Sequence, residues 1–73
     1  MARELNEMVR DFGTDLLSSL IAARKEAESG DAYAVGHKAG LYEALSMLLN
    51  RARAFGVPLS SLNLEGIDPD RFI

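Results

Sequence analysis

Hydrophobic side chains recur along residues 2–28 at the period of one helical face. They are separated by steps of three or four residues, which predicts an α-helix with one buried side. The positions that share this side are Leu5, Val9, Phe12, Leu16, Leu20, Ala23 and Ala27. Met8, Leu17 and Ile21 widen the stripe, which is typical of a helix that contacts more than one neighbour. Gly13 is a poor helix former, but the apolar phase continues through it, so we expect a continuous helix.

A second helical pattern covers residues 32–55, and a short turn separates it from the first. In the turn, Gly30 can take the left-handed conformation that ends a helix, and Asp31 can cap the next one. The link is too short for a crossover, so the two helices are expected to lie antiparallel. The predicted apolar face of the second helix consists of Val35, Ala39, Tyr42, Leu45, Leu49 and Ala52, extended by Leu41 and Leu48.

The tail, residues 56–73, begins with a helix stop and then carries too many apolar side chains to remain in water. Gly56 and Pro58 end the second helix. Residues 61–65 alternate like a very short strand, and Asp68-Pro69 can open a single helical turn. We therefore expect the tail to fold back over a helix pair, either its own or a partner's. The fold class is all-α, in one small domain spanning residues 1–73.

The small size of the chain predicts self-association. A core in 73 residues contributes little stability alone, so a disulfide, a metal or a partner is normally required. The sequence has no cysteine, and the single histidine, His37, cannot make a structural zinc site without two or three carboxylates beside it. We expect no metal and no cofactor, but a homo-oligomer, most simply a dimer in which two hairpins form a four-helix bundle. The alternative is a monomer whose tail covers the hairpin in cis.

A line of small residues in the second helix indicates close helix packing. Gly36, Gly40 and Ala44 stand at i, i+4 and i+8. A glycine inside a helix costs about 1 kcal/mol relative to alanine, so we expect another helix to approach there, either within the hairpin or from a second copy. The residues predicted to pack helix against helix are Gly36, Gly40, Ala44, Leu16, Leu20, Leu45 and Leu48.

Charge disfavours nucleic acid as a partner, and the short apolar runs disfavour a membrane span. The net charge is −3 and the sequence pI about 4.9, opposite to the balance that phosphate backbones attract. No apolar run approaches the roughly 20 residues of a bilayer span, and the first residues do not resemble a secretory signal. The expected location is cytoplasmic.

One cluster of basic residues is a candidate anion site. Antiparallel pairing about residue 30 would bring Arg24, Lys25, His37 and Lys38 together near Tyr33. Such a cluster can hold a nucleotide phosphate through charge-assisted hydrogen bonds. The simpler interpretation is that neighbouring acidic side chains neutralise it as solvated surface pairs.

No catalytic motif is present, so we expect a protein that is not an enzyme. The size and charge suit a non-enzymatic interaction module: a small homodimeric adaptor or inhibitor that binds another protein, of the kind found among immunity proteins, antitoxins and phage-encoded inhibitors. A nucleotide-binding or anion-sequestering dimer is the alternative, and a DNA-binding regulator is less favoured still.

Overall fold

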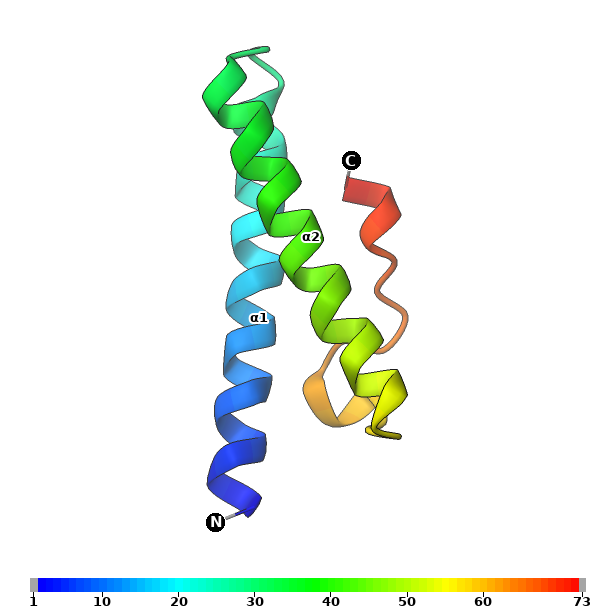
Figure 1. Cartoon of the computed structure of the whole chain (residues 1–73). Helices are drawn as coiled ribbons and strands as arrows, with labels where there is room; N and C mark the ends of the chain where they lie inside the picture. Colours follow the sequence, from blue (N-terminus) through cyan, green and yellow to red (C-terminus); the bar gives the residue numbers. More distant parts are fainter. Residues whose placement is uncertain (1, 73) are drawn as a thin grey trace.

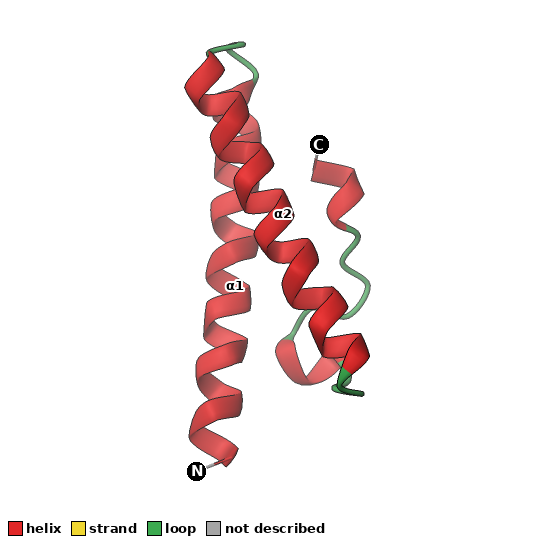
Figure 2. Cartoon of the chain, in the orientation of Figure 1, coloured by secondary structure: helices red, strands yellow, loops and turns green. Residues whose placement is uncertain are grey.

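Two long helices joined by a tight turn form the body of the protein (Figure 1). The computed structural model describes residues 2–72, in which α1 spans Ala2–Ala27 and α2 spans Ala32–Ala54. Two short 3-10 helices follow, η1 at Leu59–Leu62 and η2 at Pro69–Phe72. No strand occurs in this part of the chain (Figure 2). The predicted helical hairpin is confirmed, and each long helix ends one residue earlier than predicted.

The turn between the helices has the predicted chemistry. Gly30 has a φ of 78°, a left-handed backbone conformation that glycine adopts without steric cost. The Asp31 carboxylate accepts a hydrogen bond of 3.2 Å from the backbone N–H of Ala34, which is one of the unpaired donors at the start of α2. The turn therefore ends α1 and begins α2 within four residues, which holds the two helices antiparallel.

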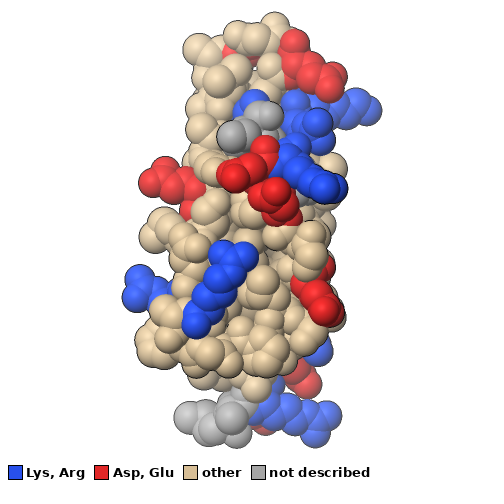
Figure 3. All heavy atoms as spheres, turned by 90° about the vertical axis from the view of Figure 1, so that its right-hand side faces the viewer, with Lys and Arg blue, Asp and Glu red and all other residues tan. Residues whose placement is uncertain are grey.

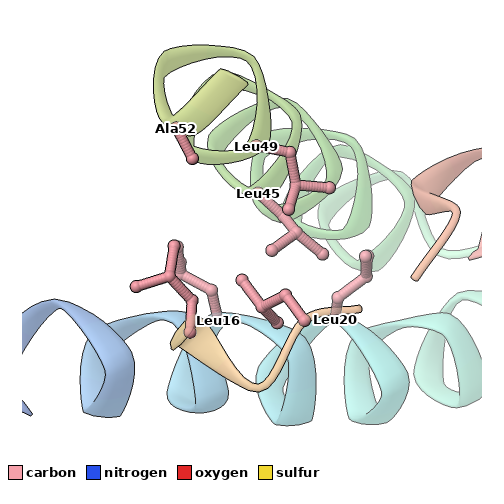
Figure 4. Packing of buried hydrophobic residues seen from close by; sticks show 7 residues of the cluster. Leu16, Leu20, Leu45, Leu49 and Ala52 are labelled. Atoms are coloured by element: carbon pink, nitrogen blue, oxygen red, sulfur yellow. The ribbon is translucent and has the colours of Figure 1, made fainter. Parts of the chain in front are cut away.

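The core lies where the inner faces of α1 and α2 meet (Figure 4). Leu16 and Leu20 of α1 point toward Leu45, Leu49 and Ala52 of α2. Among the described residues no polar or charged side chain is buried. Burial of the core leucine and alanine side chains removes apolar surface from water and supplies most of the stabilisation of the fold.

The buried face of α2 differs from the predicted one near the turn. Val35 and Ala39 are exposed, whereas Ala34 is buried. The prediction for Val35 and Ala39 is therefore wrong. The difference follows from the helical period. Ala34 shares a face with Leu41, Leu45 and Ala52. Val35 and Ala39 are turned away from that face.

The tail folds back along one side of the hairpin, as predicted, but contains no strand (Figure 1). Leu62 ends η1, Asn63 takes a left-handed conformation with a φ of 56°, and Leu64 follows. Both leucines are buried in the core. The apolar alternation that suggested a strand over residues 61–65 thus arises from a turn that directs Leu62 and Leu64 inward, so the strand prediction is wrong.

Two leucine side chains pack closely against Gly13, a residue of α1. A Cβ atom at Gly13 would lie 3.1 Å from Cδ1 of Leu64 and 3.2 Å from Cδ2 of Leu48. Glycine at this position therefore lets the tail and α2 close over α1, and α1 remains continuous through it. The space left by the missing side chain is filled by the two leucines.

The hairpin is elongated, with principal extents of 42 × 19 × 15 Å. Its Cα radius of gyration is 13.1 Å, whereas a compact domain of this length has about 11 Å. The accessible surface is 5192 Å², compared with about 4,450 Å² for a compact monomer of 8.0 kDa. The chain therefore exposes about 700 Å² more than its mass requires.

Candidate functional site

A groove lies between the helices at the open end of the hairpin, away from the turn. Its volume is about 320 Å³. The two helices diverge toward this end, and η1 lies between them (Figure 1). We call this cavity the open-end groove. Its lining residues are Leu5, Asn6, Val9, Leu48, Arg51, Ala52, Phe55, Val57 and Leu62.

The open-end groove is lined almost entirely by apolar side chains. Seven of its nine lining residues are apolar, and the polar ones are Asn6 and Arg51. Leu5 is 56% exposed and Phe55 is 74% exposed, so each presents most of its apolar area to solvent. The groove thus combines apolar walls with one guanidinium group.

Further large apolar side chains extend the surface along α1. Met8 and Phe12 are 61% and 58% exposed. They stand at i+3 and i+7 from Leu5, so the three side chains share one helical face beside the groove. We call Leu5, Met8 and Phe12 the α1 stripe. Contiguous exposed apolar surface of this kind marks interaction sites in soluble proteins.

Acidic side chains border the α1 stripe. Glu4, Glu7 and Asp11 each directly precede a stripe residue, and Asp15 continues their line, so the four acids lie about 100° around α1 from the stripe. All four are exposed. The apolar stripe therefore has a negatively charged edge.

The leucines predicted to pack helix against helix do so within the hairpin, while the glycines do not. Leu16, Leu20 and Leu45 are buried in the core, and Leu48 and Ala44 are half-buried beside it. Gly36 and Gly40 are exposed, and a Cβ at either position would have no neighbouring atom within 4 Å. The possibility that these glycines serve the contact between α1 and α2 is therefore wrong. Contact between two copies stays a prediction.

The predicted anion cluster does not form an enclosed pocket. The rings of Tyr33 and His37 stack with centroids 5.9 Å apart, and both side chains are exposed. Arg24 and Lys25 are exposed and Lys38 is half-buried. None of the five lines any of the three cavities described for this chain. On the face that carries the tail, basic and acidic side chains are intermixed (Figure 3).

A second, polar cavity lies where the tail meets α2. It has a volume of about 330 Å³ and is lined by Tyr42, Ser46, Leu49, Asn50, Arg53, Ile67, Asp68, Pro69 and Asp70. The Tyr42 hydroxyl donates a hydrogen bond to the Asp70 carboxylate, and this bond raises the pKa of the tyrosine. The Arg53 guanidinium donates one of 3.4 Å to the side-chain oxygen of Asn50. Sequence reasoning missed this cavity because no local pattern links Tyr42 with Asp70.

Among the described residues, no three His, Cys, Asp or Glu side chains are grouped as a metal ion would need. Neither long helix within residues 2–72 has the length and apolar content of a bilayer span. Comparison with protein families, with curated proteins and with solved structures finds no match to this chain.

Proposed function

We propose that this protein is a non-enzymatic interaction module that acts as a homodimer, in the manner of a small adaptor or inhibitor that binds another protein. One observation carries the proposal: the α1 stripe and the open-end groove form an exposed apolar surface on one part of the hairpin. Each Å² of apolar surface removed from water contributes roughly 25 cal/mol, so a partner that covers this surface is bound favourably.

The surface area supports a partner of ordinary size. A stable protein interface buries about 800 Å² on each partner, which is close to the roughly 700 Å² that the hairpin exposes in excess of a compact monomer. A dimer of two such hairpins would bring four helices together, and a bundle of this kind would shield the side chains that one hairpin leaves in water.

Sedimentation velocity over a range of concentrations tests the proposal. We expect the wild-type chain to sediment as a dimer and Phe12→Ser to sediment as a folded monomer, because Phe12 is exposed and its loss leaves no cavity. Ile21→Ser is the matched control: Ile21 is 51% exposed on α1 but lies outside the α1 stripe. A wild-type chain that stays monomeric up to millimolar concentration would overturn the homodimer.

Anion binding is the second proposed function, and the Tyr33–His37 stack favours it. Two stacked rings on the surface can extend their stack onto a nucleobase, while Lys38 on the same helix can meet a phosphate. A ligand that binds the folded chain and not the unfolded one raises its melting temperature, and the rise grows with the ligand concentration. If ATP, GTP and inorganic phosphate leave the melting temperature unchanged, this second function is excluded.

A further inference from the structure

We infer that the occupant of the open-end groove is a second copy of this chain, placed so that α1 of each copy lies along α2 of the other. This inference rests on the proposed function, and it adds the arrangement of the helices. It commits to one of two two-fold arrangements of a pair of hairpins packed face to face. In the other arrangement α1 packs on α1 and α2 on α2.

The start of α1 and the end of α2 lie at the same height along the long axis of the hairpin. Leu5 and Val9 line the same groove as Leu48, Arg51 and Phe55, so the start of α1 and the end of α2 are side by side. A two-fold axis parallel to the helices places each residue of the second copy at the same height along the hairpin as in the first copy. It therefore brings the partner's α1 stripe onto the end of α2 and into the groove.

The start of α1 and the groove end of α2 carry charges of opposite sign. Residues 2–15 contain four acidic and two basic side chains, a net charge of −2. The end of α2 contributes Arg51 to the groove, whereas Arg53 lies in the polar cavity on the tail side. Packing α1 on the partner's α2 brings the acidic edge of α1 to the end of α2 that carries Arg51. Electrostatic complementarity of this kind selects the orientation of partners more than it adds affinity.

The exposed apolar surface carries both a projecting stripe and a groove, so two copies of it can fit each other. An isologous interface requires one surface that carries both halves of every contact. The groove and the stripe share Leu5, Arg51 lines the groove, and the acidic edge borders the stripe. A different protein would have to supply both halves independently. The excess exposed area of about 700 Å² also matches what each copy of a stable dimer buries.

The helix face that meets the partner explains the position of one glycine. Helical spacing places Gly40 and Ala44 on the side of α2 that also carries Leu48 and Arg51. In the proposed arrangement the partner's α1 crosses α2 over these small residues, where the two backbones can approach closely. Gly40 has open space around it in the single hairpin, as this crossing requires.

A charge exchange tests the arrangement. Arg51→Glu and Glu7→Arg are each expected to weaken the dimer about tenfold at low salt, because two symmetric contacts change from attraction to repulsion. The double variant carrying both changes should recover wild-type affinity. High salt should reduce all of these differences. A dimer that Glu7→Arg strengthens, or that the double variant fails to restore, would overturn the arrangement.

Disulfide cross-linking gives an independent test, because the chain has no cysteine of its own. A mixture of Met8→Cys copies and Arg51→Cys copies should oxidise mainly to the mixed dimer. A mixed dimer that is no more abundant than the two homodimers would overturn the arrangement. Sedimentation of the untreated chain distinguishes failure of the arrangement from failure of the proposed function. A dimer with the wrong cross-links contradicts only the arrangement, whereas a monomer contradicts both the arrangement and the homodimer.

Discussion

The hydroxyl of Tyr42 donates a hydrogen bond to the carboxylate of Asp70, and this contact ties α2 to η2. The two residues are 28 positions apart in the chain. Asp70 is itself held in place by its backbone N–H, which donates to the Asp68 carboxylate at 3.1 Å. The tail therefore has a polar attachment at its far end, in addition to the buried contacts of Leu62 and Leu64.

Replacing Tyr42 with phenylalanine should loosen this attachment and alter the response to alkaline pH. The hydrogen bond to Asp70, followed by burial, raises the pKa of Tyr42 above its unfolded value of about 10. The neutral phenol is thus favoured in the folded chain. Its contribution is fully present below about pH 10 and is lost as pH rises through the raised pKa.

Urea unfolding across this alkaline range measures the effect. The stability of wild type should fall more steeply with pH than that of Tyr42→Phe, so the two curves should converge at high pH. Tyr33→Phe serves as the control, because Tyr33 is exposed and contacts His37 rather than the tail. Parallel curves for wild type and Tyr42→Phe would contradict the prediction.

Two glycines should respond oppositely to alanine. At Gly36 a Cβ meets no atom within 4 Å, so Gly36→Ala should gain about 1 kcal/mol from improved helix propensity. At Gly13 the added Cβ would press on Leu48 and Leu64 at 3.2 and 3.1 Å, and about 1–2 kcal/mol of overpacking should cancel or exceed that gain. Thermal and urea unfolding give both values. Equal stabilisation by both substitutions would show that the leucines relax freely.

Gly40→Leu should break the dimer without unfolding the hairpin. The open space around Gly40 accepts a side chain in a single copy, whereas a helix from a second copy would be pushed away. Sedimentation should report a monomer and circular dichroism unchanged helicity. Ala39→Leu is the matched control, since Ala39 is exposed about 100° around α2. A Gly40→Leu dimer as tight as wild type would contradict the prediction.

The cap at the start of α2 should be worth about 1 kcal/mol. Asp31→Ala removes the acceptor for the Ala34 N–H and leaves that donor without a side-chain partner. The free energy of unfolding should fall by about this amount, and Asp31→Asn, which keeps an oxygen acceptor, should retain most of it. Asp15→Ala tests for a general effect of charge, because Asp15 is exposed within α1.

Local chemistry made the hairpin predictable. Gly30 supplies the left-handed backbone conformation of the turn, and Asp31 caps the helix that follows it. Both roles depend only on neighbouring residues, so they can be predicted from the local sequence. Helix periodicity likewise identified Leu16, Leu20, Leu45 and Leu49 as inner residues. The strand predicted over residues 61–65 failed because a 3-10 turn and a strand can both direct Leu62 and Leu64 to one core.

Long-range contacts were beyond local patterns. The glycine in close contact is Gly13, where the tail returns to α1, and nothing near residue 13 in the sequence signals the approach of Leu64. The open-end groove was also unexpected, since it exists only because η1 lies between the diverging helices. Each of these features depends on residues about fifty positions apart.

The chain's own tail covers one flank of the hairpin (Figure 1). In the proposed dimer, each copy would cover the flank of the other that carries the open-end groove, and the assembly would close at two copies. A hairpin without the tail would expose apolar surface on two faces and could associate repeatedly into a fibre. The tail would thus set the size of the assembly, acting as a stopper against fibre growth.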